Sequence, residues 1–311
     1  MIKDIAVTSS PHLRDSISTK RIMQEVCLAL APAGIAGIVL FGINAAALIA
    51  VCVLCCVLCE YLFQKISHQK ITVGDWSAVV TGLLLAYNLP ANAPLWIAVI
   101  GSVIAIILVK QCFGGIGANF VNPALAARAI LFVSWSGIMA NYPTTNFMTD
   151  AVSTATPLAL IAGGQSVNIL SLLIGNCGGV LGETCKIAII VGGVWLIIRK
   201  IADWRIPVFF IGTAFIAYLL SGGFNVALSE ILSGGLLLGA FFMATDYTTS
   251  PMTKIGRVIM GIGCGILVFV IRSYASYIEG CSFAILFMNV MTPMIDRFTV
   301  GKKFGEVKSN G

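Results

Sequence analysis

The segment Asp150–Pro157, Asp-Ala-Val-Ser-Thr-Ala-Thr-Pro, is the first candidate in this sequence for a site that holds a ligand. It lies in the longest polar interruption of a very apolar chain, between Asn141 and Asn168, and this interruption contains neither Lys nor Arg. In membrane proteins, loops that lack Lys and Arg tend to face away from the cytoplasm. Threonine and serine also form turns and helix caps, so residue type alone leaves a structural role and a ligand-holding role open.

A glycine-rich break between two apolar runs is the second candidate site. The break, Gly114–Pro123, places Asn119 and Asn122 just before a helix that is predicted to begin near the proline. Backbone N–H groups at a helix start are free to bind an anion or a polar ring. Irregular backbone at membrane depth has to be buried in protein or to line a cavity. The alternative interpretation is an ordinary loop at the inner face.

Charged side chains within or beside apolar runs are further candidates, because each costs several kcal/mol in hydrocarbon unless it is paired or hydrated. Asp246 ends an apolar run in a cluster of Thr and Ser, which suits an ion path, a cofactor contact or a hydrogen-bonded helix end. Glu183 is predicted to pair with Lys186 near the outer face. Arg128, one turn into a predicted helix, has a guanidinium that suits a phosphate or a carboxylate.

Metal binding is the weaker interpretation of the cysteines and histidines. The Cys-x-x-Cys-Cys-x-x-Cys run between Cys52 and Cys59 lies inside an apolar helix and follows one stripe of it. Four thiolates on one straight helix cannot close around a metal, so small packing residues are favoured. His12 and His68 have no companion ligands, and the sequence shows no nucleotide-binding motif or catalytic triad.

Composition predicts an all-α integral membrane protein. Of 311 residues, 58% are hydrophobic and only 10% are charged, against about 25% charged residues in soluble domains. Apolar runs near the length of a membrane-spanning helix recur along the chain. The polar start of the chain predicts no cleavable signal peptide. The net charge of +6 comes from basic residues that flank apolar runs, so it indicates membrane topology and not nucleic-acid binding.

The apolar runs predict about ten transmembrane helices in two inverted five-helix repeats, because an odd number of helices per half turns the second half upside down. The first repeat covers 22–140 and the second 183–296, and they flank an extracytoplasmic loop with a short re-entrant segment at 141–182. A cytoplasmic N-terminal segment, 1–21, and a basic cytoplasmic tail, 297–311, complete the chain. The predicted helices are 22–42, 45–63, 75–89, 95–112, 124–139, 183–198, 206–220, 228–244, 255–273 and 281–295.

Ordered matches along nearly the whole chain resemble one membrane-protein family. It includes the D subunit of the Rnf complex, a bacterial and archaeal ferredoxin:NAD⁺ oxidoreductase, and the B subunit of the sodium-translocating NADH:quinone reductase. The lack of a long N-terminal extension favours the Rnf branch. The matching segments are Ser10–His12, Asp75–Leu85, Gly114–Asn119, Asn122–Ala124, Asp150–Pro157, Gly182–Thr184, Trp204–Pro207, Gly239–Pro251, Glu279–Gly280 and Ser282–Ala284.

The resemblance implies a covalent flavin in the outer loop. Members of the family carry FMN through a phosphoester on a threonine in a motif that maps here onto Asp150, Ser153, Ala155 and Thr156, with Thr156 as the acceptor. Thr154 stands where glycine is usual. A flavin transferase attaches such groups outside the cytoplasm, in agreement with the predicted side of the loop.

A second, non-covalent flavin, riboflavin, is also implied, and we expect it near the break that holds Asn119 and Asn122. Arg128 is a further candidate for a cofactor contact. Electrons would pass between flavins held in the bundle, and cation uptake, Na⁺ or H⁺, would offset the added charge. Asp246 and Glu183 are the candidates for the ion path.

The implied setting is the bacterial cytoplasmic (inner) membrane, which the chain crosses many times with both termini in the cytoplasm. Its implied partners are the lipid bilayer, the other Rnf subunits (A, B, C, E and G), and the flavin transferase. In this interpretation the chain belongs to an enzyme, an ion-translocating oxidoreductase, and is active only within the complex. The alternatives are a component similar to the B subunit of the quinone reductase and a passive inverted-repeat channel or transporter.

Overall fold

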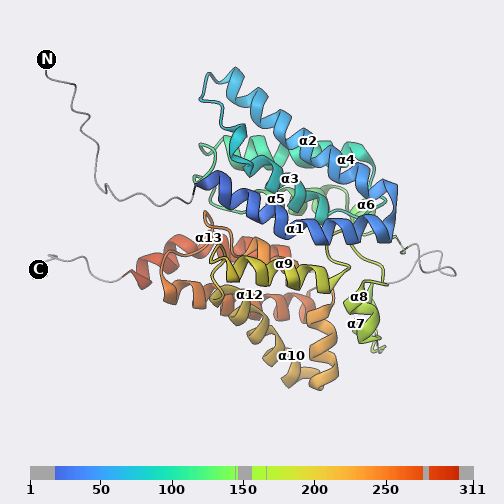
Figure 1. Ribbon diagram of the computed structural model, residues 1–311. Helices are drawn as coiled ribbons and strands as arrows, with labels where there is room; N and C mark the ends of the chain where they lie inside the picture. Colours follow the sequence, from blue (N-terminus) through green and yellow to red (C-terminus); the bar gives the residue numbers. More distant parts are fainter. Residues whose placement is uncertain (1–17, 144, 146–155, 166, 276–279, 301–311) are drawn as a thin grey trace, which may run out of the picture.

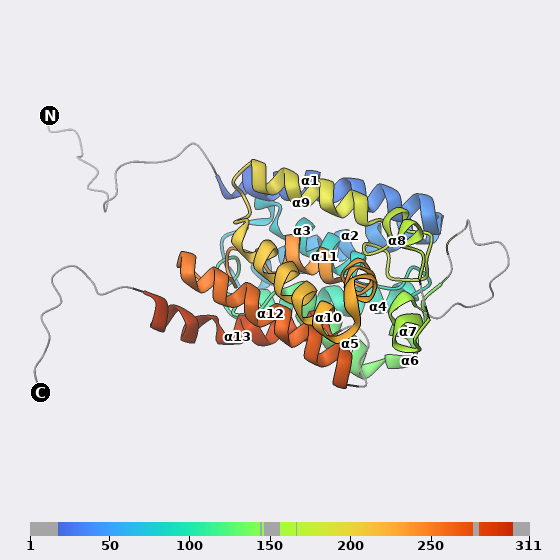
Figure 2. The same cartoon turned by 90° about the horizontal axis from the view of Figure 1, so that it is seen from below.

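Figure 1 shows the computed structural model, which describes residues 18–143, 145, 156–165, 167–275 and 280–300. Helices and the loops between them make up these residues, with one isolated β-bridge between Pro90 and Val180. Two groups of helices lie against each other, α1 to α6 in one and α9 to α13 in the other (Figures 1 and 2). The described ends of the chain lie at one end of the molecule, and α7 and α8 lie at the opposite end.

The first group begins where Ser18 accepts a hydrogen bond from the N–H of Arg21 and so caps its first helix. The fifth helix of this group begins at Pro123, and Asn122 caps it through the N–H groups of Ala124 and Leu125. The elements are α1 (Thr19–Phe41), α2 (Ile43–Ile66), the 3₁₀ turn η1 (Val73–Asp75), α3 (Ser77–Tyr87), α4 (Leu95–Val103), its π-helical continuation η2 (Ile104–Gln111), α5 (Pro123–Ser134) and α6 (Ser136–Met139).

Two short helices separate the groups, and the second group is interrupted near its centre. The linking helices are α7 (Pro157–Ala162) and α8 (Ile169–Ile174). The second group consists of α9 (Lys186–Ile198), α10 (Arg205–Leu232), α11 (Leu236–Leu238), the π-helix η3 (Gly239–Met243), α12 (Lys254–Tyr274) and α13 (Cys281–Thr299). π-helical turns are rare and favour functional sites, and each half contains one.

The predicted break between helices at 206–220 and 228–244 is confirmed, but the second of these helices is itself interrupted. α10 consists of two helical segments that meet at a kink at Gly223, where φ is 82° and ψ is −179°. The chain leaves the second segment at Ser233 and turns at Gly234, whose φ of 62° favours glycine. Both interruptions contain a Ser-Gly-Gly sequence, and the prediction continued a helix across the second of them.

Within the described residues, four helices are long and apolar enough to cross a membrane: α1, α2, α10 and α12. Shorter apolar helices accompany them, namely α3, α4 with η2, α5 and α9. These lengths support a membrane protein, while the count of ten spans stays a prediction.

Corresponding helices of the two groups pack against each other. The start of α1 lies against the end of α9, because Glu25 pairs with Arg199 at 2.6 Å and accepts a hydrogen bond from Trp195. The start of α13 similarly contacts α5 through Ser282 and Arg128. First helix on first helix and fifth on fifth, each antiparallel, is the arrangement that inverted repeats would produce. The repeats themselves remain a prediction that this packing favours.

Close approach of α2 and α3 depends on Gly82, and we expect Gly82→Ala to destabilise the fold by about 1–3 kcal/mol. An added Cβ would lie 2.8 Å from Val53 Cα and 3.0 Å from Cys52 O. Gly212→Ala in α10 is the control, since its Cβ would meet no atom within 4 Å and it gains helix propensity. Thermal unfolding in detergent compares the two, and equal midpoints would contradict the packing argument.

Candidate functional site

A buried cluster around Arg128 joins four separate parts of the chain. Arg128 Nη1 in α5 donates to Asn88 Oδ1 at 2.8 Å and to Ser282 Oγ at 2.9 Å. It also lies 3.4 Å from Glu183 Oε1, with both side chains almost fully buried. Asn88 follows α3, Glu183 precedes α9 and Ser282 begins α13. We call these four residues the arginine cluster. The Arg128 guanidinium, which the sequence predicted to suit a phosphate or a carboxylate, is paired with the carboxylate of Glu183.

The predicted Glu183–Lys186 ion pair is wrong, because the Glu183 carboxylate is paired with Arg128. Lys186 Nζ instead donates to the backbone carbonyls of Glu183 and Gly234, the latter at 2.7 Å. Glu183 also lies outside the predicted helix, since α9 begins at Lys186. The turn before α9 directs the carboxylate to one partner and leaves the ammonium at backbone oxygens.

Thr156 is placed at the start of α7, where its hydroxyl accepts a hydrogen bond from the N–H of Ala159 at 3.3 Å. The helix-cap interpretation of this threonine is therefore confirmed. Thr156 also lines a small cavity of about 20 Å³ together with Glu183, Thr184 and Lys186. A ligand-related role is compatible with this position, because the cavity wall carries a buried ammonium. The other predicted motif residues, Asp150, Ser153 and Ala155, lie outside the described residues.

The asparagines of the glycine-rich break and Asp246 meet in a second cavity, of about 90 Å³. Asn119 Nδ2 donates to Thr248 Oγ1 at 3.0 Å, and that hydroxyl donates to Asp246 Oδ2 at 3.1 Å. Asn122 Nδ2 donates to the carbonyl of Met243 at 3.4 Å. We call this cavity the Asn–Asp pocket. It combines amide donors, amide acceptors and a carboxylate on walls contributed by both helix groups.

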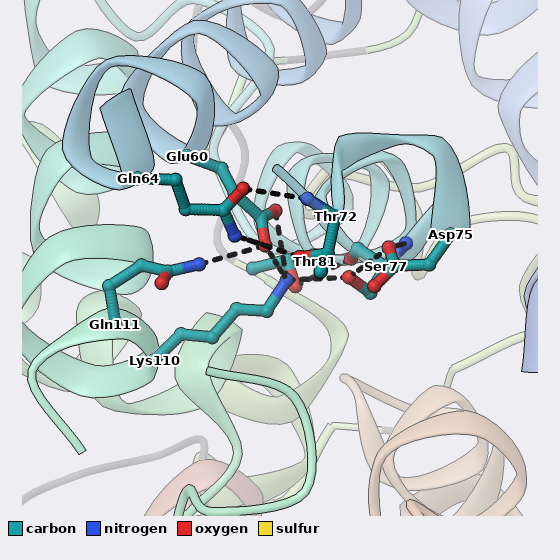
Figure 3. A network of polar contacts seen from close by, with 8 residues as sticks. All are labelled: Glu60, Gln64, Thr72, Asp75, Ser77, Thr81, Lys110 and Gln111. Atoms are coloured by element: carbon teal, nitrogen blue, oxygen red, sulfur yellow. Dashed lines mark hydrogen bonds and ion pairs between the residues drawn. The ribbon is translucent and has the colours of Figure 1, made fainter. Parts of the chain in front are cut away.

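A network of polar side chains continues from the Asn–Asp pocket into the first helix group (Figure 3). Lys110, which lines the pocket, lies 2.9 Å from Glu60 Oε2 and donates to Ser77 Oγ at 2.6 Å. Ser77 Oγ donates to Asp75 Oδ1 at 2.6 Å, and Gln111 donates to Glu60 at 2.8 Å. Lys110 and Glu60 are both buried.

The predicted site residues thus lie in two separate places. The sequence identified the residues but did not show how they are grouped. Arg128, Glu183 and Thr156 lie around the arginine cluster, whereas Asn119, Asn122 and Asp246 line the Asn–Asp pocket.

Sequence reasoning missed the Glu60–Lys110 pair. Both residues lie within apolar helices, where a charge is costly unless it is paired, and that signal was sufficient to find them.

The cysteines pack and do not form a metal site in the described part of the chain. All ten are free, and Cys52 and Cys56 are fully buried in α2. Among the described residues no three His, Cys, Asp or Glu side chains gather as a metal ion would require. The prediction that the cysteine run fills helix contacts is confirmed for these two residues.

Comparisons with known proteins agree with the resemblance seen in the sequence. The model of the NQR2, RnfD, RnfE family matches residues 6–305. The D subunit of the Na⁺-translocating ferredoxin:NAD⁺ oxidoreductase complex of Acetobacterium woodii is 51% identical, over 98% of this chain and 96% of that protein. The D subunit of the proton-translocating ferredoxin:NAD⁺ oxidoreductase complex of Clostridium ljungdahlii is 41% identical, over 96% of each. The D subunit of the ion-translocating oxidoreductase complex of Stutzerimonas stutzeri is 37% identical, over 93% of this chain and 92% of that protein.

The arginine cluster supplies a stability prediction. We expect Arg128→Met to destabilise the fold by about 3–5 kcal/mol, because it leaves the Glu183 carboxylate buried without its cation. Adding Glu183→Gln should recover part of that loss. Denaturation of both single variants and the double variant measures the coupling. Effects that simply add would show that the two side chains do not interact energetically.

Proposed function

This chain belongs to the NQR2, RnfD, RnfE family, and we propose from that premise that it is the electron-transferring membrane subunit of an ion-translocating ferredoxin:NAD⁺ oxidoreductase. The observation that carries the proposal is the 51% identity, over almost the full length of both chains, to a protein named as the D subunit of such a complex. The four long apolar helices agree with a place in the membrane. The alternative, a component of a quinone reductase, has less support, since two of the three relatives compared above are named as subunits of ferredoxin:NAD⁺ oxidoreductases.

A covalent FMN on Thr156 is the first part of the proposed mechanism. The residues around Thr156 fit a phosphoester: the Lys186 ammonium lines the same cavity and uses two of its three N–H groups on backbone carbonyls. A cavity of about 20 Å³ has room for roughly one water molecule, so it suits the linkage and not the flavin ring. Lys186 would offset the negative charge of the phosphoester, and Thr156 would fix the linkage at the start of α7.

The Asn–Asp pocket is the proposed site of a second, non-covalent flavin, riboflavin. The ring edge of a flavin presents alternating hydrogen-bond donors and acceptors. Asn119, Asn122 and Thr248 offer both kinds of group, and Asp246 adds an acceptor. When bound, the flavins supply the electron-carrying chemistry, and the protein supplies position, hydrogen bonds and exclusion of water. Arg128 belongs to the arginine cluster and is not among the residues that line this pocket, so the proposed riboflavin site does not include it.

Cation uptake is proposed to accompany each electron, because negative charge added to a dry bundle is costly without a counter-ion. Asp246 is the proposed carboxylate of the ion path, since it lines the Asn–Asp pocket beside Lys110. Glu183 does not line this pocket, and its charge is already paired with that of Arg128. Its proposed place in the ion path is therefore outside the Asn–Asp pocket. Two relatives are named for the translocation of different ions, one for Na⁺ and the other for H⁺. The proposal therefore covers cation translocation and not a particular cation.

The proposed setting follows from the same premise. The end of the molecule where α1 begins and α13 finishes would face the cytoplasm. The opposite end, with α7 and Thr156, would face outward, where a flavin transferase can reach it. Basic residues cluster at the first of these ends, for example Arg21, Arg199, Lys254 and Arg297, as the positive-inside rule expects. The partners are the other subunits of the complex and the lipids of the bacterial inner membrane.

Covalent flavin attachment is tested with Thr156→Asn in the native host. Asn retains a side-chain helix cap but has no hydroxyl to esterify, so the variant should fold and carry no covalent flavin. On a denaturing gel the wild-type chain should fluoresce under ultraviolet light, and its intact mass should exceed the sequence mass by one phosphoester-linked FMN. Thr184→Ala, in the same cavity, should keep both signals. A fluorescent Thr156→Asn chain would refute the attachment site.

Ion coupling is tested with Asp246→Asn in the intact complex, reconstituted in vesicles. We expect fewer cations moved per electron, because the variant removes the charge that the pocket offers to a cation. Glu25→Gln is the control, since this carboxylate lies at the α1–α9 contact and outside the pocket. An unchanged cation-to-electron ratio in the combined Asp246→Asn, Glu183→Gln variant would refute a role for both carboxylates.

A further inference from the structure

A third cavity, of about 230 Å³, opens at the turn between α9 and α10. It lies at the end of the molecule where α1 begins, because Arg199 in this turn pairs with Glu25 in α1. Thr245 and Tyr247 line both this cavity and the Asn–Asp pocket. The proposed electron-transfer function does not use this cavity. We call it the basic cavity, after the positively charged side chains that line it.

Positively charged side chains outnumber negatively charged ones in the lining of the basic cavity. Lys200, Arg205 and Arg257 line it with one carboxylate, Asp203, which leaves a formal surplus of two positive charges. Asp203 Oδ2 lies 2.6 Å from Arg257 Nη1 and 3.0 Å from Arg205 Nη1. Partial burial opposes its ionisation, but hydrogen bonds from the Arg205 N–H and the Arg257 guanidinium outweigh burial and lower the pKa of Asp203. The carboxylate is therefore ionised at neutral pH and holds both guanidinium groups in place.

Apolar side chains and an aromatic ring also line the cavity. The apolar ones include Ile197, Ile201 and Ile206. Trp204 is 48% exposed, and the Arg205 guanidinium lies 5.1 Å from the centre of its ring. Tryptophan beside Arg and Lys is typical of the level of lipid headgroups. The lining thus combines fixed cations with hydrocarbon side chains.

We propose that the basic cavity binds the phosphate group of an anionic phospholipid, with the guanidinium groups and Lys200 around the phosphate and the isoleucine side chains against the glycerol and upper acyl chain. Arg is suited to phosphate because its planar fork donates two parallel hydrogen bonds. Free phosphate shares that chemistry but would leave the isoleucines without an apolar partner. An acidic segment of another protein would also fail to match the isoleucines, so a lipid fits the mixed lining best.

Such a lipid would fix the α9–α10 turn next to the Asn–Asp pocket. Tyr247, shared by the two cavities, donates its hydroxyl proton to the carbonyl of Ile201 in that turn. The bound headgroup would then be a structural ligand at the pocket rim, independent of whether a flavin occupies the pocket.

Amine labelling of the intact complex tests the proposal. Lys200 and Lys254 are both exposed at the same end of the molecule, and only Lys200 lines the cavity. The complex is placed in nanodiscs of phosphatidylcholine, in the same nanodiscs with added inorganic phosphate, and in nanodiscs that contain phosphatidylglycerol. We expect Lys200, relative to Lys254, to be acetylated several-fold more slowly in phosphatidylglycerol alone. Equal labelling in all three, or protection by phosphate without lipid, would overturn the lipid assignment.

Variants give a second readout, the phosphatidylglycerol that co-purifies with the complex. Each cation removed should weaken retention by roughly fivefold, the factor that corresponds to about 1 kcal/mol per basic residue near a membrane surface. Lys200→Gln is the primary variant, because Lys200 makes no ion pair among the described residues and its loss spares the fold. Lys254→Gln is the matched control. Equal lipid retention in the two variants, or protection of Lys200 that requires another protein of the complex and no lipid, would refute the proposal.

Discussion

The buried guanidinium of Arg128 is the constraint on which the assembly of the two helix groups depends. A charge with almost no solvent contact needs both a counter-ion and hydrogen-bond acceptors. Arg128 obtains them from Asn88 in its own group and from Glu183 and Ser282, which lie at the starts of two elements of the other. Neither group could bury this side chain alone, so the same contact that satisfies the charge also fixes how the groups face each other.

Broken helices are the structural consequence of placing polar groups in an apolar bundle. Side chains such as Asn88, Glu183 and Asp246 all lie just beyond helix ends, where the backbone is free to turn toward a neighbour. In the segments around Pro90 and Val180, the backbone groups hydrogen-bond to each other instead. The N–H of Leu181 donates to the carbonyl of Leu89. Irregular backbone is tolerated here because protein covers it and exchanges hydrogen bonds with it.

Which polar side chains are buried or line a pocket was largely predictable from the sequence, and which partners they have was not. A charge or an amide in an apolar run is conspicuous by type, so Arg128, Glu183 and Asp246 could be singled out. The structure buries the first two and places the third at a pocket. Pairing depends on contacts between distant segments. Spacing along a helix favoured Lys186 as the partner of Glu183, whereas the actual partner lies 55 residues away. Similarly, Ser-Gly-Gly interrupts a helix at two places, whereas the sequence prediction continued a helix across the second.

Met243, at the end of the π-helix η3, contacts both groups of site residues. Its carbonyl accepts a hydrogen bond from Asn122 in the Asn–Asp pocket, and its sulfur lies 3.8 Å from Asn88 Nδ2 in the arginine cluster. A π-helix departs from regular helical hydrogen bonding and is frequent at functional sites. Here such a turn ends at a residue whose carbonyl faces the pocket and whose sulfur faces the cluster that joins the helix groups, so the two sites share a wall.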